Sequence, residues 1–554
     1  MNKFVKSVLS VCLCLAMLLT VSSVAFALTL TGEGTEESPY LITDLASLKA
    51  FASEVNSGNS FEGKYVRLEN DIKVDSSFTP IGTKTAPFSG YFDGNSKKLS
   101  SLSLKCDYAG VFGYTDGAEI TSLTVAGTCR ATDYAGAVVA YAKDTVIRNC
   151  TGAANVYADS FNGGIVGYIE SGAVEGCKVN TRISIGGYVE NCGGIAGYSG
   201  ADITECVNNA FVYGEKNVGG IAGSSTGDIA LCTNASRIEA SDSNVGGIAG
   251  ITEGKIRYSK NNGMVISSGT GVGKAGGIAG VAYKAEIAEC ISAGVLTVSG
   301  NYAGGIAGYI TNTAINNCVA AANVTTSQDY AGGIFGYSLS SQVNKCIFTA
   351  TASATAAKGG VGALSAGTVT DCYFNGDKND KALAAGSSST VTAIKEADIL
   401  DKSVYTALDF NSLWTINTVH ASYPLPKNSN YHNLTVTSTS YATCTENGII
   451  ASTCSVCQET VLDVTPAFGH SYIVISYAEV SCTVDGYKDE LCTVCGDTVS
   501  TDYPAPGHKD NNSDNKCDAC GINMLQNQIQ EKGFFQKIVD FFNSIIEWFR
   551  NLFK

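Results

Sequence analysis

The most regular feature of the chain is a pattern of small and apolar positions that repeats between residues 106 and 376. Phrases of the form Gly-Gly-Ile-small-Gly, such as AGGIAGY beginning at Ala303, return at intervals of 26 to 30 residues. The second glycines of the ten copies are Gly110, Gly136, Gly164, Gly194, Gly220, Gly247, Gly277, Gly305, Gly333 and Gly360. Ten phased copies of one short unit predict a solenoid.

Each repeat holds three short apolar segments separated by Asn, Gly, Ser, Asp and Thr. These segments are too short for helices, and strong helix formers are scarce among them. We therefore expect a mostly β protein whose centre is a parallel β-helix of about ten coils. In such a helix each strand pairs with its equivalent one coil away, about 4.8 Å along the axis.

A column of cysteines follows the glycines by 12 to 14 residues in most repeats. Its members are Cys150, Cys177, Cys206, Cys232, Cys290, Cys318, Cys346 and Cys372. Parallel Cβ vectors about 4.8 Å apart do not suit a disulfide, which needs about 3.8 Å, and a line of thiols cannot surround zinc. Ser259 and Leu123 take the same place in two repeats. We interpret the column as buried core filling.

The regions flanking the repeats predict caps for the open ends of the β-helix. Within residues 28–105, Asp44 is suited to begin an amphipathic helix, and Asp93 and Gly94 predict a hairpin after a strand. An α/β cap of this kind would cover the unpaired edge of the first coil. Residues 377–430 are expected to cap the other end and to link the β-helix to the C-terminal region.

The first 27 residues predict a secretory signal peptide. Lys3 and Lys6 precede an apolar run, and Ala25-Phe26-Ala27 has the small-x-small pattern of a cleavage site. We expect cleavage after Ala27 and an extracellular protein, either secreted or associated with the cell surface.

Charge limits the class of partner. The chain carries a net charge of -15. Loss of two lysines and no acids with the signal peptide lowers the charge to -17. Because binding to phosphates needs clustered Lys and Arg, we expect no nucleic-acid partner.

A second repeat, H-x11-C-x9-C-x2-C, occupies residues 431–521 with a period of 38 residues. The ligand-type residues are His432, Cys444, Cys454, Cys457, His470, Cys482, Cys492, Cys495, His508, Cys517 and Cys520. Three thiols with one imidazole are a common structural zinc set, whereas disulfides are the alternative in an exported protein. We predict about two structural zinc ions. Each site could use the histidine that precedes its thiols or the one that follows them.

The last segment, residues 522–554, is predicted to form an amphipathic helix. Between residues 531 and 554 polar residues recur every three or four positions, and nearly all the others are Phe, Ile, Val, Leu or Trp. Three roles are open: packing on its own module, self-association, or lying in a membrane interface. We favour the last two, and suppose that the helix retains the protein at the cell surface.

Several of these motifs resemble known bacterial repeats. GGIAGY…AINNCVAAANV is similar to the GLUG motif of extracellular and surface proteins, and CTVDGYKDELCTVCG resembles modules near the C-termini of secreted Firmicutes proteins. The resemblance implies a surface or secreted scaffold, often adhesin-like, without activity of its own. Some zinc peptidases that cleave immunoglobulin carry such repeats beside a catalytic domain, but this chain has no HExxH motif.

The repeat region also offers little for catalysis. It has no histidine, and its acidic residues follow no common column. Lyases and hydrolases of polysaccharides, which also use β-helices, need clustered carboxylates or a base. We therefore expect a non-catalytic protein that presents a β-helix face to a glycan or a protein. The alternative is a β-helix polysaccharide lyase or hydrolase, which two or more carboxylates in a groove beside Lys or Arg would favour.

Overall fold

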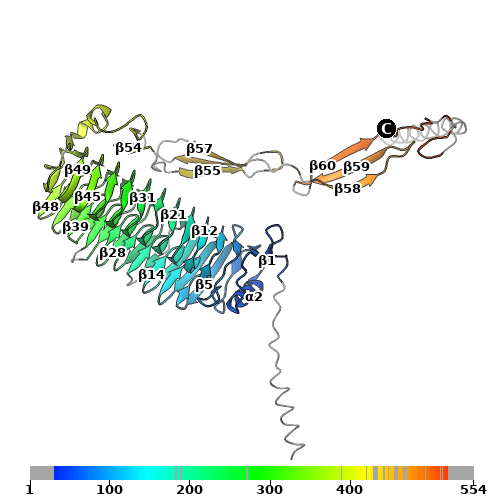
Figure 1. Ribbon diagram of the computed structural model, residues 1–554, viewed down its shortest axis with the longest axis horizontal. Helices are drawn as coiled ribbons and strands as arrows, with labels where there is room; N and C mark the ends of the chain where they lie inside the picture. Colours follow the sequence, from blue (N-terminus) through cyan, green and yellow to red (C-terminus); the bar gives the residue numbers. More distant parts are fainter. Residues whose placement is uncertain are drawn as a thin grey trace, which may run out of the picture. The chain divides into compact units, whose positions relative to one another are not determined.

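The computed structural model describes residues 30–180, 184–186, 190–269, 273–388, 390–418, 421–427, 434–440, 443–446, 448–454, 460–465, 470, 472–492, 495–511, 513 and 516–521. The chain divides into two compact units, Met1–Tyr431 and His432–Lys554 (Figure 1). The expected signal peptide and the expected amphipathic helix both lie outside the described residues. Among the described residues, no helix has the length and apolar character needed to cross a membrane.

The first unit is a parallel β-helix of about 12 turns, which confirms the predicted fold (Figure 1). It has more turns than the ten repeats suggested because the flanking stretches also form coils. One central coil consists of β24 (Val218–Gly219), β25 (Ala222–Ser225), β26 (Ile229–Ala230), β27 (Thr233–Asn234) and β28 (Ile238–Ala240). Each strand pairs in parallel with its equivalent in the next coil, β29 (Val245–Gly246), β30 (Ala249–Thr252), β31 (Lys255–Arg257), β32 (Lys260–Asn261) and β33 (Val265–Ser267).

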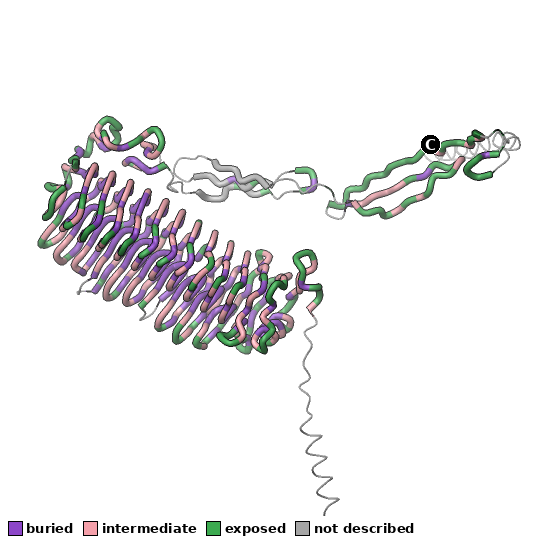
Figure 2. The backbone as a smooth tube through the Cα atoms, viewed as in Figure 1, coloured by how far each residue is buried: buried purple, intermediate pink, exposed green. Residues whose placement is uncertain are grey.

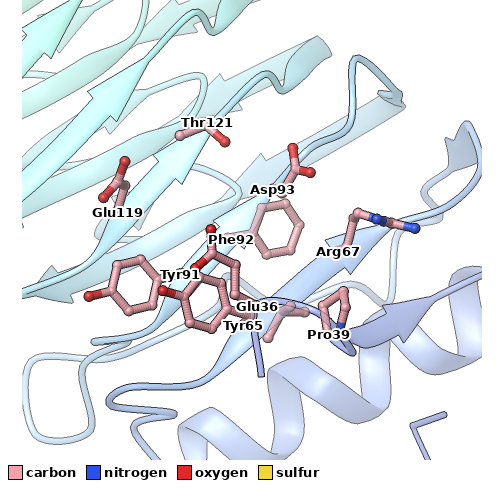
Figure 3. Close-up of a pocket in the computed structure, with 10 residues that line it drawn as sticks. Glu36, Pro39, Tyr65, Arg67, Tyr91, Phe92, Asp93, Glu119 and Thr121 are labelled. Carbon is pink, nitrogen blue, oxygen red and sulfur yellow. The ribbon is translucent and has the colours of Figure 1, made fainter. Parts of the chain in front are cut away.

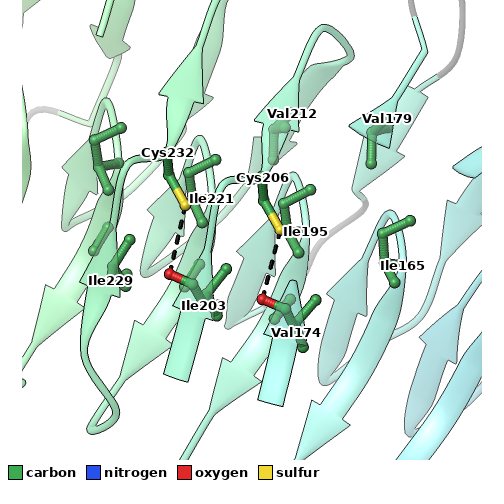
Figure 4. Packing of buried hydrophobic residues seen from close by; sticks show 14 of the residues in the cluster. Ile165, Val174, Val179, Ile195, Ile203, Cys206, Val212, Ile221, Ile229 and Cys232 are labelled. Atoms are coloured by element: carbon green, nitrogen blue, oxygen red, sulfur yellow. Dashed lines mark hydrogen bonds between the residues drawn. The ribbon is translucent and has the colours of Figure 1, made fainter. Parts of the chain in front are cut away.

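The repeating apolar positions line the inside of the coils, where buried residues recur turn after turn (Figure 2). The isoleucines of successive glycine phrases, including Ile195, Ile221 and Ile248, are fully buried (Figure 4). The glycines let neighbouring coils approach closely. A Cβ atom on Gly220 would overlap the carbonyl oxygen of Gly247 in the next coil. The repeat is therefore dictated by the contact of backbone with backbone.

The column cysteines are buried and free, as predicted. Each thiol also donates hydrogen bonds to backbone carbonyls. Cys206 Sγ lies 3.7 Å from the carbonyl oxygen of Val174 in the preceding coil and 3.2 Å from that of Thr204 (Figure 4). Ser259 replaces the thiol with a hydroxyl that donates to the carbonyl oxygen of Arg257 at 2.9 Å. A small side chain with a donor thus suits this place better than a purely apolar one.

These thiols are expected to resist alkylation while the β-helix is folded. Burial raises the pKa of Cys150, Cys206 and Cys318, and only the thiolate reacts readily. Mass spectrometry after brief exposure to iodoacetamide should find the column unmodified without denaturant and fully modified with it. Cys106, which is partly exposed, is the internal control and should react first. Column labelling as fast as that of Cys106 would contradict the assignment.

The residue before each column position adopts a left-handed backbone. Only one of these ten positions is a glycine. They are Ser122, Asn149, Gly176, Glu205, Leu231, Tyr258, Glu289, Asn317, Lys345 and Asp371, with φ between 52° and 61°. This conformation is unfavourable for most side chains, so stacking of the coils must impose it at every turn.

The N-terminal region agrees with its prediction in part. Helix α2 (Leu45–Asn56) begins after Asp44, whose side chain accepts from the backbone of Ser47 at 2.8 Å. The hairpin prediction was wrong. β4 (Tyr91–Asp93) pairs in parallel with β2 (Tyr65–Leu68) and with β8 (Glu119–Thr121), as coil strands do. The Asp93 carboxylate accepts from the Asn95 backbone at 2.7 Å, which turns the chain around a corner of the coil instead of reversing it.

Residues 377–427 complete the other end. β51 (Leu383–Ala385) and β52 (Thr392–Ile394) add a further partial turn. The following segment packs Tyr405 and Trp414 onto the column formed by Val319, Ile347 and Tyr373. These residues thus extend the β-helix and also cover an apolar stretch of its outer face.

The second unit contains two three-stranded antiparallel sheets. The first consists of β55 (Leu434–Ser440), β56 (Gly448–Cys454) and β57 (Thr460–Thr465). The second consists of β58 (Tyr472–Ala478), β59 (Gly486–Cys492) and β60 (Thr498–Tyr503). Each meander corresponds to one copy of the 38-residue repeat.

Candidate metal centres

Two groups of side chains in the second unit could hold a metal ion. Each has three cysteines and one histidine, and within each the four ligand atoms lie within 4.8 Å of one another. The groups are Cys444, His470, Cys492 and Cys495, and Cys482, His508, Cys517 and Cys520. Eight of the eleven residues expected to bind metal are thereby brought together.

In the first group, successive repeats contribute different ligands. Cys444 lies in the connection between β55 and β56, whereas Cys492 ends β59 and Cys495 follows it. His470 stands just before β58. The first group therefore combines the lone cysteine of one repeat with the histidine and the C-x2-C pair of the next.

The second group is built in the same way. Cys482 lies in the connection between β58 and β59, and His508, Cys517 and Cys520 follow β60. This grouping differs from the expected one, in which all three thiols came from one repeat. The histidine follows the lone cysteine but precedes the C-x2-C pair. His432 and Cys457 lie outside the described residues, and Cys454 is described only as the last residue of β56.

The distances within the groups fit tetrahedral coordination. Zinc at about 2.3 Å from sulfur and about 2.0 Å from nitrogen implies sulfur–sulfur edges of about 3.8 Å and sulfur–nitrogen edges of about 3.5 Å. The Sγ atoms of Cys444 and Cys492 are 3.7 Å apart, and those of Cys482 and Cys517 are 3.5 Å apart. A disulfide needs about 2.05 Å, so neither pair is bonded.

The histidines approach their groups through Nδ1. Cys495 Sγ lies 3.4 Å from His470 Nδ1, and Cys520 Sγ lies 3.3 Å from His508 Nδ1. Both distances are close to a sulfur–nitrogen edge of a zinc tetrahedron, about 3.5 Å. The two groups therefore share one ligand geometry.

The thiols of each group influence one another's ionisation. The hydrogen bond with His508 lowers the pKa of the Cys517 thiol to about 5. Hydrogen bonds with Cys517 and Cys520 raise the pKa of the Cys482 thiol to about 11. Burial and hydrogen bonds with its neighbours raise the pKa of Cys444 to about 12. Because three thiolates so close together repel one another, a cation is needed for all three to ionise at neutral pH.

The acidic residues of the β-helix form ion pairs between coils. Arg148 lies 2.6 Å from Glu119 in the preceding coil and 2.7 Å from Glu175 in the following one. Arg257 pairs with Glu286 at 2.6 Å in the same way. Several of the scattered acids thus have a partner one coil away, which the sequence pattern alone did not reveal. Their spacing by one repeat could have shown it.

Comparison with known proteins gives no family. No family model and no curated protein matches the chain. Among solved structures, the chain is similar to a Bacteroides ovatus protein proposed to be an immunoglobulin A1 protease. The identity is 17%, the TM-score is 0.35, and the match covers 72% of this chain and 95% of that one.

Proposed function

We propose that this protein is a non-catalytic extracellular or cell-surface scaffold, adhesin-like, that presents its β-helix face to a glycan or protein ligand. Its second unit is held together by two structural zinc ions, one in each three-cysteine–histidine group. The expected membership of the GLUG-motif proteins and the export of the chain belong to this proposal.

The observation that carries the proposal is the closed ligand set of the metal groups. Each group supplies four protein ligands to one point. Catalytic zinc sites keep one position open for water or substrate, whereas structural sites fill all four with protein. The part of the chain best equipped for metal chemistry is therefore suited to a structural role.

The surface of the β-helix suits binding over a broad area. Tyr114, Tyr141, Tyr168 and Tyr198 form a ladder of stacked rings across four coils, with centroids 4.6, 4.9 and 4.5 Å apart. The ring faces cover one another and only their edges meet solvent. Half-buried tyrosines supply contact area at a low cost in side-chain entropy, and they are common in protein interfaces.

A polysaccharide lyase or hydrolase remains the second candidate because one hollow of the β-helix contains carboxylates beside an arginine. Glu36, Asp93 and Glu119 line it together with Arg67. Two of these groups already have partners. Arg67 pairs with Glu69 at 2.7 Å, and Glu119 pairs with Arg148. This pairing favours a binding surface over a general acid and base pair.

Glycan and protein arrays probed with the mature chain, residues 28–554, should distinguish the two functions. We expect retention of at least one ligand class, with no release of reducing ends or unsaturated sugars from any polysaccharide. Turnover would contradict the scaffold. Loss of that turnover in Asp93→Asn would place the activity in the hollow.

A further inference from the structure

The hollow at the N-terminal end of the β-helix has features of a ligand site. It lies on the outer face of β2, β4 and β8 and has a volume of 350 Å³ (Figure 3). Residues from the loop before β1 (Tyr40–Ile42) form one side. Segments from four successive parts of the chain meet there because the coils stack in register.

An exposed aromatic surface forms part of the hollow. The rings of Tyr65 and Tyr91 stack with centroids 4.4 Å apart and planes at 11°. Tyr91 is 39% exposed. The residue in register with Tyr91 in the next coil is Glu119, so the ladder of rings stops there and is followed by a carboxylate. In the long ladder, by contrast, each inner ring is covered on both faces.

The charges around these rings are mainly negative. Glu36, Asp93 and Glu119 line the hollow, and after burial the charges of Glu36 and Glu119 contribute to raising the pKa of Tyr65. The positive charge of Arg67 is offset by Glu69. In the described part of the chain, no salt bridge joins a basic side chain to Glu36 or Asp93. The hollow therefore has negative charge to spare.

We propose that this hollow binds the guanidinium or ammonium group of a basic segment of a partner protein. A cation near the Tyr91 ring is attracted by its π electrons, and the neighbouring carboxylates add ionic attraction. A neutral sugar could stack on the ring but would gain nothing from the excess negative charge. The net charge of -15 on the whole chain also favours encounter with a basic partner. The proposal rests on the scaffold function and gives its ligand a place and a chemistry.

The test measures binding of a short fluorescent peptide with three arginines to the mature chain by fluorescence anisotropy. Tyr91→Ala should weaken binding about five-fold, whereas Tyr91→Phe, which keeps the ring, should change it less than about two-fold. The matched control is Tyr330→Ala. Tyr330 stacks on Tyr302 with centroids 5.3 Å apart and planes at 9°, away from the hollow.

Charge is tested in the same assay. Glu36→Gln with Asp93→Asn should weaken binding roughly ten-fold at low salt, and the loss should shrink as salt screens the charges. The charge-matched control is Glu253→Gln with Asp159→Asn, two exposed acids elsewhere on the β-helix. It should change binding less than about two-fold.

Three outcomes would overturn the proposal: no peptide binding, equal losses in the two charge pairs, or a Tyr91-dependent binding of a neutral oligosaccharide that the peptide does not displace. Each of these leaves the scaffold function standing. Degradation of a ligand would instead contradict the scaffold function itself.

Discussion

Removing zinc is expected to unfold the second unit while the β-helix stays folded. The sheets of this unit have little core of their own. In β58, Ile473, Val474, Ile475 and Tyr477 are 50%, 49%, 52% and 69% exposed (Figure 2). Structural zinc contributes on the order of 10–16 kcal/mol in small metal-dependent domains, more than such sheets gain by burial. Hydrogen exchange with and without a zinc chelator should show protection lost throughout residues 434–521 and unchanged in residues 40–394.

Substitutions within the unit test which residues share an ion. Cys492→Ser should lower the bound zinc from two ions per chain to one, because Cys492 belongs to the first group. Cys454→Ser, the matched control, should leave both ions in place, because neither group includes Cys454. Elemental analysis of the purified chain gives the count. Loss of an ion in Cys454→Ser and none in Cys492→Ser would mean that each repeat binds its ion alone.

Gly220→Val is expected to cause the largest loss of stability in the β-helix. Its side chain would overlap the backbone oxygen of Gly247, and backbone cannot move aside as a flexible side chain can. We expect a loss of about 3 kcal/mol or more, seen as a lower midpoint of guanidinium unfolding followed by circular dichroism. Ser224→Val in the same coil is the control. Ser224 points outward between Tyr198 and Ile251, so valine should change stability by less than about 0.5 kcal/mol. Equal effects would contradict the close packing of the coils.

The coils could be predicted because their length is written directly in the sequence. Glycine phrases and cysteines recur once per turn, so their period gives the stacking. The left-handed residue before each cysteine could not be predicted. Leu231, Tyr258 and Lys345 occupy it, and none of these side chains favours that conformation. Only the stacking of coils selects it.

A buried polar ladder shows another limit. Asn208, Asn234 and Asn261 lie inside three successive coils, and the Nδ2 of each of the first two donates to the Oδ1 of the next at 2.9 and 2.8 Å. Each follows its column position by two residues, so the period was visible. Alternation alone cannot tell that asparagine is acceptable inside. The hydrogen bonds between coils make it so.

The metal groups show why repeats identify ligands better than partners. The 38-residue period repeats every spacing, so joining three thiols within one repeat or across two repeats uses the same residue types. The fold decides, because the lone cysteine at the end of one sheet meets the C-x2-C pair of the next sheet. The hollow was missed for a related reason. Glu36 and Glu119 are far apart in sequence, and only the stacked coils bring them together.

X-ray absorption at the zinc edge of the purified mature chain tests the account most directly. Two filled groups of the observed composition predict an average of three sulfur ligands at about 2.3 Å and one nitrogen at about 2.0 Å, with two zinc ions per chain. A chain without zinc whose cysteines in residues 431–521 are oxidised to disulfides would contradict it, as would zinc bound mainly by oxygen.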